Sequence, residues 1–204
     1  MSNYGEEAKI AYQQMAESLT KLTDTVDWDV AGQVAELLIQ VKENGRKVLV
    51  AGCGTSGVAA KKIAHIMNVI MVPCFFLSPT GAVHGDLGAV QKDDVVILIT
   101  KGGQTQALLD YVGPTKYAGA KLIAVTEEPG SELAKSSDIV LKIRVDRESD
   151  PWGMVATTST IAVMAVWDAI LIAVKAHNGL TKEDLLRIHS GGAVGAKLSG
   201  ELSE

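Results

Sequence analysis

Three short loops of the sequence combine glycine with hydroxyl side chains, a composition suited to binding an anion. The first is GCGTSG at residues 52–57, the second is TKGGQT at 100–105 and the third is TTST at 157–160. Each loop adjoins or leads into a segment with the composition of a helix. Glycine permits tight turns, and the open N–H groups and dipole of a helix N-terminus attract negative charge. We therefore expect a phosphate-binding site at these loops.

Ten residues of these loops are the candidate substrate-binding residues. They are Gly54, Thr55, Ser56, Thr100, Lys101, Gly103, Gln104, Thr105, Thr157 and Ser159. Each loop taken alone is better explained by ordinary helix capping and turn formation, which Ser, Thr and Gly also favour. The recurrence of the pattern in three loops favours a common ligand.

The glycine spacing of the first loop also matches the G-x-G-x-x-G fingerprint of dinucleotide-binding domains. That fingerprint requires an acidic residue about 20 residues further on, at the end of the second strand, to bind a ribose hydroxyl. No acidic residue occurs between Glu43 and Asp86. We therefore expect no NAD and no other cofactor, and a phosphate with a polyol tail fits the loops better.

Two histidines lie in glycine-rich loops and are the candidate catalytic residues: His84 in GAVHGDLG and His189 in RIHSGGAVG. An imidazole with a pKa near 6.5 suits proton transfer at neutral pH. His65 and His177 lie in helical patterns and are expected to be ordinary packed or surface residues. Four carboxylates near predicted strand ends are further candidate bases, which position alone does not rank: Asp86, Glu127, Glu128 and Asp150.

Five short apolar runs alternate, for most of the chain, with segments of helical spacing. The runs cover residues 47–52, 71–77, 94–100, 121–126 and 138–143. Helices are predicted over residues 3–24, 28–44, 56–70, 104–118, 130–136, 154–176 and 181–188, the last with a capping box at Thr181. Continuous apolar runs indicate strands covered on both faces, as in a parallel sheet between helical layers. The pattern predicts an α/β fold, a three-layer, doubly wound five-stranded parallel sheet with helical N- and C-terminal extensions, and ligands bind at the carboxyl ends of such strands.

The composition indicates one globular domain over residues 1–204, since 47% of the residues are hydrophobic and 21% are charged. We divide it into N-terminal helices (1–46), an α/β core (47–145) and C-terminal helices with the HSGG segment (151–198). The net charge of −5 argues against a nucleic-acid-binding surface. The two cysteines have no metal-binding or disulfide spacing, and the acidic start does not match a signal peptide, so we expect no metal site and a cytoplasmic protein.

The apolar stretch 154–174 is long enough to cross a bilayer. Asp168 lies near its centre, however, and a charge at mid-bilayer costs at least about 2.5 kcal/mol. A helix that is apolar almost all round is also expected in a large core or at a subunit interface. We therefore expect a homo-oligomer and no membrane span.

The sequence resembles the sugar isomerase (SIS) domain family and is most similar to bacterial arabinose 5-phosphate isomerases. Together the matching pieces span most of the chain, and HGDLG and HSGGAVG in one chain are a specific combination. In family order they are GCGTSG (52–57), VHGDLG (83–88), DDVVILITKGGQT (93–105), VATTST (155–160) and IHSGGAVGAKL (188–198).

The resemblance implies a flavodoxin-like fold, a dimer or tetramer, and interconversion of an aldose phosphate with a ketose phosphate through a cis-enediol, without a redox cofactor. It implies that Ser56, Thr100 and Thr105 hold the phosphate. It also implies that His189 acts as the base or the ring-opening acid, and that His84 supports it as a proton donor or hydroxyl ligand.

The sequence departs from arabinose 5-phosphate isomerases at two functional positions. Thr55 stands where their first loop has lysine, and Gln104 stands where their second loop has glutamate, which a neutral amide cannot replace as a base. Lys101 is a candidate to restore the lost positive charge. The CBS modules that often follow the domain are also not expected here.

Two functions remain open on this evidence. The first is an aldose–ketose isomerase, possible substrates being arabinose 5-phosphate and ribulose 5-phosphate. The alternative is a non-catalytic, regulatory sugar-phosphate sensor, which the loss of the glutamate at Gln104 favours and the retention of both histidines opposes.

Overall fold

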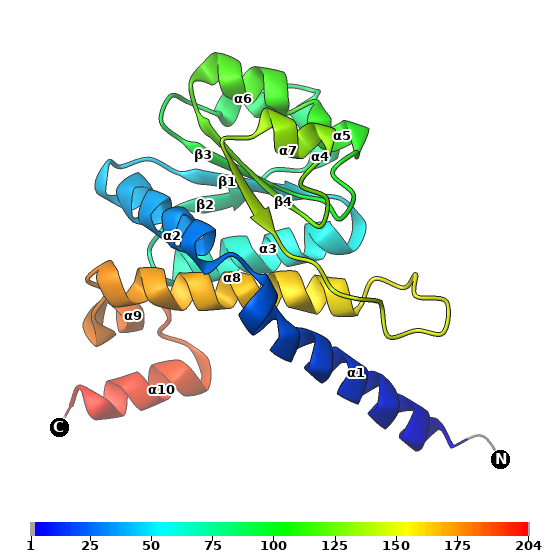
Figure 1. Cartoon of the computed structure of the whole chain (residues 1–204). Helices are drawn as coiled ribbons and strands as arrows, with labels where there is room; N and C mark the ends of the chain where they lie inside the picture. The colour runs from blue at the N-terminus through cyan, green and yellow to red at the C-terminus, as the bar shows by residue number, and fades with distance from the viewer. Residues whose placement is uncertain (1–2, 204) are drawn as a thin grey trace.

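A five-stranded parallel sheet forms the centre of the computed structural model, which describes residues 3–203 (Figure 1). Its strands lie in the order β2-β1-β3-β4-β5. Their bounds are β1 Val48–Gly52, β2 Cys74–Phe76, β3 Val95–Ile99, β4 Lys121–Thr126 and β5 Ile139–Lys142. All five predicted strands are therefore confirmed, although β2, at the edge of the sheet, is much shorter than its apolar run.

The register of the central strands brings the first two hydroxyl-rich loops together. The last residue of β1, Gly52, pairs with Ile99 at the end of β3, and Ile99 pairs with Val125 of β4. The strand order reverses between β1 and β3, and in open α/β sheets ligands bind at this switch point. The loops that follow β1 and β3 therefore start side by side at the carboxyl edge of the sheet.

Helices cover both faces of the sheet, which confirms the predicted three layers (Figure 1). Alternate strand residues point to opposite faces, so each strand contributes to both cores. One core lies beneath α2 (Trp28–Glu43), α3 (Gly54–Val69) and α8 (Thr158–His177). The other face carries four shorter helices: α4 (Pro79–Ala82), α5 (Gln106–Leu109), α6 (Val112–Ala118) and α7 (Glu132–Ser136).

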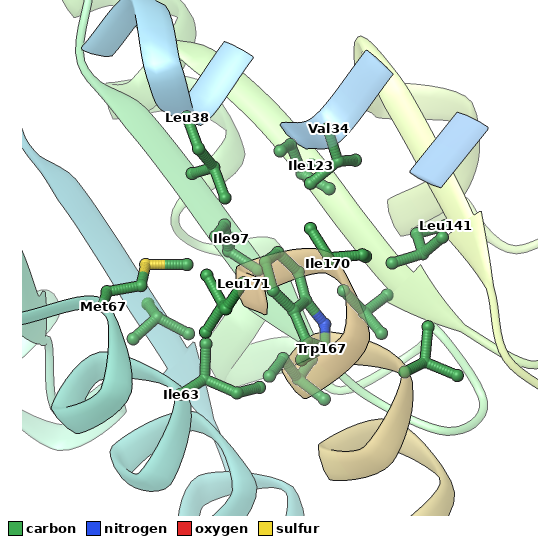
Figure 2. Packing of buried hydrophobic residues seen from close by; sticks show 14 of the residues in the cluster. Val34, Leu38, Ile63, Met67, Ile97, Ile123, Leu141, Trp167, Ile170 and Leu171 are labelled. Carbon is green, nitrogen blue, oxygen red and sulfur yellow. The ribbon is translucent and has the colours of Figure 1, made fainter. Parts of the chain in front are cut away.

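Helix α8 is a core helix along one face. Trp167, Ile170 and Leu171 are buried and pack against side chains of α2, α3 and the sheet (Figure 2). By length and hydropathy alone α8 is a candidate membrane span, with a third of its apolar window buried in the fold. Its central Asp168 pairs with Lys62 of α3. The opposite side of α8 leaves Ile172 70% exposed.

Two predicted helices begin or break differently in the structure. The predicted helix 104–118 is divided into α5 and α6, because Pro114 has no N–H group and is tolerated only in the first turn of a helix. The predicted helix 154–176 begins at Thr158, because the Asp150 carboxylate accepts hydrogen bonds from the amides of residues 152, 154 and 155 and holds them in a turn.

The ends of the chain extend away from the sheet (Figure 1). Helix α1 (Tyr4–Thr25) projects from the body, and Leu22 is the one buried residue among those described in it. Helix α9 (Lys182–Ile188) has the predicted capping box, in which Thr181 and Asp184 satisfy each other's amides. Helix α10 (Gly192–Glu201) was not predicted as a helix, because its sequence is rich in glycine.

Candidate active site

A small cleft lies at the carboxyl edge of the sheet, between the first turns of α3 and α8. Its volume is about 50 Å³, well below the roughly 300–1,000 Å³ of common small-molecule sites. A phosphate-sized group fits such a space, and the rest of a larger ligand would lie in its mouth. The polar residues that line it are Thr55, Ser56, Thr100, Lys101, Thr126, Glu127, Ser159 and Thr160.

The first loop presents an open helix N-terminus to this cleft. Gly52 is required where strand and helix meet, since a Cβ there would lie 2.6 Å from the Ser56 carbonyl oxygen. Gly54 has a φ of +55°, and Cys53 at the N-cap makes no side-chain cap. The amides of Gly54, Thr55 and Ser56 have no hydrogen-bond acceptor within the described part of the chain. These N–H groups and the dipole of a 16-residue helix are therefore available to an anion.

The second loop is a closed turn with a similar set of open amides. Gly103 has a φ of +66°, and a Cβ there would lie 2.0 Å from Ser131 Oγ, so only glycine fits. The hydroxyls of Thr100 and Thr105 are hydrogen-bonded to each other at 2.9 Å, which closes the turn. The amides of residues 102–104 find no acceptor among residues 3–203. The loop therefore offers a second group of donors beside the first.

The third loop differs, because a carboxylate of the protein already occupies its helix N-terminus. Glu148, whose side chain is 1% exposed, accepts hydrogen bonds from the amides of Thr157 and Ser159 at 3.0 and 3.2 Å. The Ser159 hydroxyl and the Lys101 ammonium bind the other carboxylate oxygen, Lys101 Nζ at 2.7 Å. Burial alone would raise the pKa of Glu148, but Lys101 and these donors outweigh it and lower the pKa to about 2. A phosphate could reach this helix end only by displacing Glu148.

The carboxyl-bearing residue that lines the cleft is Glu127, whereas the buried Glu148 does not line it. The Oε1 atom of Glu127 is buried, has no hydrogen-bond partner among the described residues, and lies 3.8 Å from Lys101 Nζ. Burial raises the pKa of this carboxyl, and the Lys101 ammonium and a hydrogen bond from the Val145 backbone offset only part of that rise. Two carboxyls with opposite pKa shifts therefore lie beside one lysine of the cleft.

The structure brings together half of the predicted binding residues. Thr55, Ser56, Thr100, Lys101 and Ser159 line the cleft. Gly54, Gly103, Gln104 and Thr105 belong to the same loops without lining it. Thr157 faces a separate groove beneath α1. The assignment of a phosphate to these ten residues stays a prediction.

The two predicted catalytic histidines lie outside the cleft of their own chain. His189 follows α9, at the far end of α8 from Ser159, and an α-helix of 20 residues is about 30 Å long (Figure 1). Its Nδ1 is buried without a partner among the described residues. His84 is exposed in the turn between α4 and the short 3₁₀ helix η1 (Asp86–Ala89). Neither histidine reaches the cleft within one chain.

Of the four carboxylates that the sequence did not rank, Glu127 alone lines the cleft. Asp150 holds the turn before α8, and Glu128 is exposed. Glu148 was missed altogether, because it lies in a charged run that resembles a solvated loop. Its position shortly before a hydroxyl-rich helix start was the one available signal. Among the described residues, no group of three or more His, Cys, Asp or Glu is placed to hold a metal ion.

Comparison with known proteins connects this cleft to a protein family. Residues 36–173 match the family model described as the SIS domain. The chain is 30% identical to arabinose 5-phosphate isomerase KdsD of Francisella tularensis over 198 residues, which are 97% of this chain and 60% of that protein. The chain spans about half the length of the curated relatives it matches.

Solved structures give similar results over their whole length. A candidate sugar-phosphate isomerase from Listeria monocytogenes is 40% identical, with a TM-score of 0.90 over 94% of this chain and 100% of that one. A protein of E. coli CFT073, solved in complex with a sugar phosphate, is 32% identical, with a TM-score of 0.86 over 93% of this chain and 100% of that one.

Proposed function

The chain belongs to the SIS domain family, and from this premise we propose that it is a sugar-phosphate isomerase that interconverts an aldose phosphate and a ketose phosphate. The observation that carries the proposal is the pair of open donor groups at the cleft. One is the N-terminus of α3 and the other is the glycine turn after β3, with acid–base side chains between them and α8. This arrangement suits an anionic end group whose neighbouring carbons undergo proton transfer.

In the proposed reaction the phosphate binds the amides of the first two loops and the hydroxyls of Ser56 and Thr100. Binding at this non-reacting end supplies free energy that positions the carbons to be isomerised. A proton then moves between C1 and C2 through a cis-enediol. Arabinose 5-phosphate and ribulose 5-phosphate are the substrate pair we propose, supported by the relatives' printed names.

We further propose that the working site is shared between copies of the chain. His189 lies about a helix length from the cleft of its own chain, so a neighbouring copy must supply it if it acts as the base or ring-opening acid. Helix α1, with one described buried residue, and the exposed side of α8 offer surfaces for such an assembly, a dimer or tetramer.

The test is proton exchange with a panel of pentose, hexose and heptose phosphates in deuterium oxide, followed by NMR. An isomerase incorporates deuterium at C1 or C2 of at least one sugar phosphate. His189→Asn should fold and bind but turn over at least about a hundredfold more slowly, since a positioned acid or base contributes about 10²–10⁴-fold. Near-normal turnover would remove His189 from the mechanism.

Subunit mixing tests the shared site. His189→Asn and Thr55→Asp, each inactive alone, are coexpressed with different tags, and the mixed oligomer is isolated. Recovery of activity is expected, because one site then has both an intact loop and an intact histidine. No recovery in a verified mixed oligomer would exclude the shared site, and with it a role of His189 at this cleft.

The alternative is a non-catalytic sensor of sugar phosphates, and one observation favours it: Gln104 cannot accept a proton. A sensor would show a ligand-dependent rise in melting temperature and no deuterium incorporation. The same panel therefore separates the two functions.

A further inference from the structure

The backbone of Glu127 is held against the second loop by hydrogen bonds. Its own amide donates a hydrogen bond to the Lys101 carbonyl at 3.0 Å, and the hydroxyl of Thr126 binds the same carbonyl at 2.8 Å. The side chain is 12% exposed, against 1% for Glu148. Glu127 is therefore held in the cleft wall and, unlike Glu148, keeps part of its side chain exposed.

The surroundings of Glu127 and Glu148 determine which carboxyl is the more readily protonated. Glu148 has the close contact with Lys101 Nζ, at 2.7 Å, together with one hydroxyl and two amides. Glu127 Oε1 stands 3.8 Å from the same ammonium and has no hydrogen bond among residues 3–203. One lysine cannot compensate two buried negative charges, and two carboxylates that share a site do not both ionise easily.

The remaining polar groups of the cleft are poorly suited to donate a proton. The Lys101 ammonium forms an ion pair with Glu148, and both oxygens of Glu148 accept hydrogen bonds from backbone or side-chain donors. Hydroxyl side chains such as that of Thr160 do not release protons near neutral pH. Where two acidic groups lie in environments that push their pKa values apart, the group with the higher pKa is suited to act as an acid and the other to act as a base.

We propose that Glu127 is a general acid of this site, which donates its carboxyl proton to an oxygen of the sugar carbon being isomerised. The inference rests on the isomerase proposed above and names a catalytic residue for it. Three features support this role: Glu127 lines the cleft, its buried Oε1 has no hydrogen-bond partner among the described residues, and the nearby lysine lies closer to another carboxylate.

In the proposed step the Glu127 O–H proton passes to the substrate carbonyl oxygen, whose C=O π pair becomes the new O–H bond. The base, for which we proposed the imidazole of His189 from another copy, removes the proton from the adjacent carbon. The electron pair of that C–H bond becomes the C=C bond of the enediol. The base then gives its proton to the former carbonyl carbon through the C=C pair, and Glu127 recovers a proton from the hydroxyl of the adjacent carbon, whose O–H pair becomes the new C=O bond. This gives the isomeric sugar phosphate and restores both side chains.

The experiment compares Glu127→Gln with a matched control, Glu128→Gln, which removes an exposed carboxylate from the next position. Both are assayed with the sugar phosphate that the wild-type protein exchanges, by kcat, by KM and by the ligand-dependent rise in melting temperature. We expect Glu127→Gln to lower kcat about 10²–10⁴-fold while ligand stabilisation persists, and Glu128→Gln to change neither.

The pH profile provides a readout that a merely structural role would not change. An acid that must be protonated makes kcat fall as pH rises through its pKa, and the charged groups facing it are Lys101, Glu148 and Arg144. That alkaline limb should disappear from the residual activity of Glu127→Gln and remain in Glu127→Asp, which keeps a carboxyl. Equal kcat in the Gln variant and wild type, or an unchanged limb, would overturn the proposal. Wild-type protein that exchanges no sugar would instead overturn the isomerase and this role with it.

Discussion

The first turns of α3 and α8 face the same cleft, but the free backbone N–H groups are bound by a protein side chain at only one of them. The N-terminus of α8 is closed by the Glu148 carboxylate, whereas that of α3 has no side-chain cap and leaves its amides open. Uncapped helix ends lose stability, typically about 1 kcal/mol for a missing cap. The comparison shows that one helix end at the cleft holds an internal charge, whereas the other keeps free the donors to which we assign the phosphate.

The closed end also has a positioning role. Glu148 joins the start of α8 to Lys101 of the second loop, so it holds two walls of the cleft together and fixes the ammonium. The open end has no such internal partner among the described residues. Internal hydrogen bonds are therefore concentrated at the start of α8, and free backbone donors at the start of α3.

The largest expected effect comes from closing the open end. In Thr55→Asp a carboxylate enters the first turn of α3 and repels a bound phosphate, a repulsion of about 4 kcal/mol for unit charges 4 Å apart at an effective dielectric constant of 20. Affinity for arabinose 5-phosphate should fall a hundredfold or more, while the melting temperature stays equal or rises, because acidic groups stabilise helix N-termini. Calorimetric titration measures the affinity.

Thr55→Asn is the control, because it has nearly the same shape as the aspartate variant and no charge. It should retain most of the affinity. If the Asp and Asn variants bind equally well, the phosphate does not lie at α3 and the comparison fails.

The second effect comes from opening the closed end. Glu148→Gln keeps a hydrogen-bond acceptor but removes the charge, and we expect a loss of about 3 kcal/mol in the free energy of unfolding at pH 7, since each pKa unit is worth about 1.4 kcal/mol. The native pKa of about 2 lies below the ordinary value of 4.5. The stabilisation is therefore complete above about pH 5 and disappears as the pH falls from 4.5 toward 2.

Urea unfolding of wild type and variant between pH 7 and pH 3 measures this convergence. Asp146→Asn serves as the control, because its ion pair with Lys21 is exposed and solvent-exposed pairs contribute little to stability. A difference between wild type and Glu148→Gln that stayed constant with pH would contradict an ionised, buried Glu148.

The two helix ends also show which features of the structure could be predicted from the sequence. Apolar runs predicted all five strands, and glycines with hydroxyls predicted the loops that adjoin the cleft, because both signals are local. Glu148 was not predicted, because its role depends on the approach of Lys101 from another loop. The distance of His189 from its own cleft was not predictable either, since it follows from the direction in which α8 runs across the sheet.

The smallest expected effect comes from adding a side-chain cap to the N-terminus of α3. Cys53 occupies the N-cap with an extended backbone and makes no cap, so Cys53→Ser should add a cap worth about 0.5–1 kcal/mol. In a chain of this length such a gain raises the melting temperature by roughly 2–3 °C. The added hydroxyl would compete for an amide that we assign to phosphate, so affinity for arabinose 5-phosphate should fall by a factor of about two to five, a few tenths to one kcal/mol. Cys53→Ala, which adds no acceptor, should do neither. A serine variant that gained both stability and affinity would mean that this helix end was never kept open for a ligand.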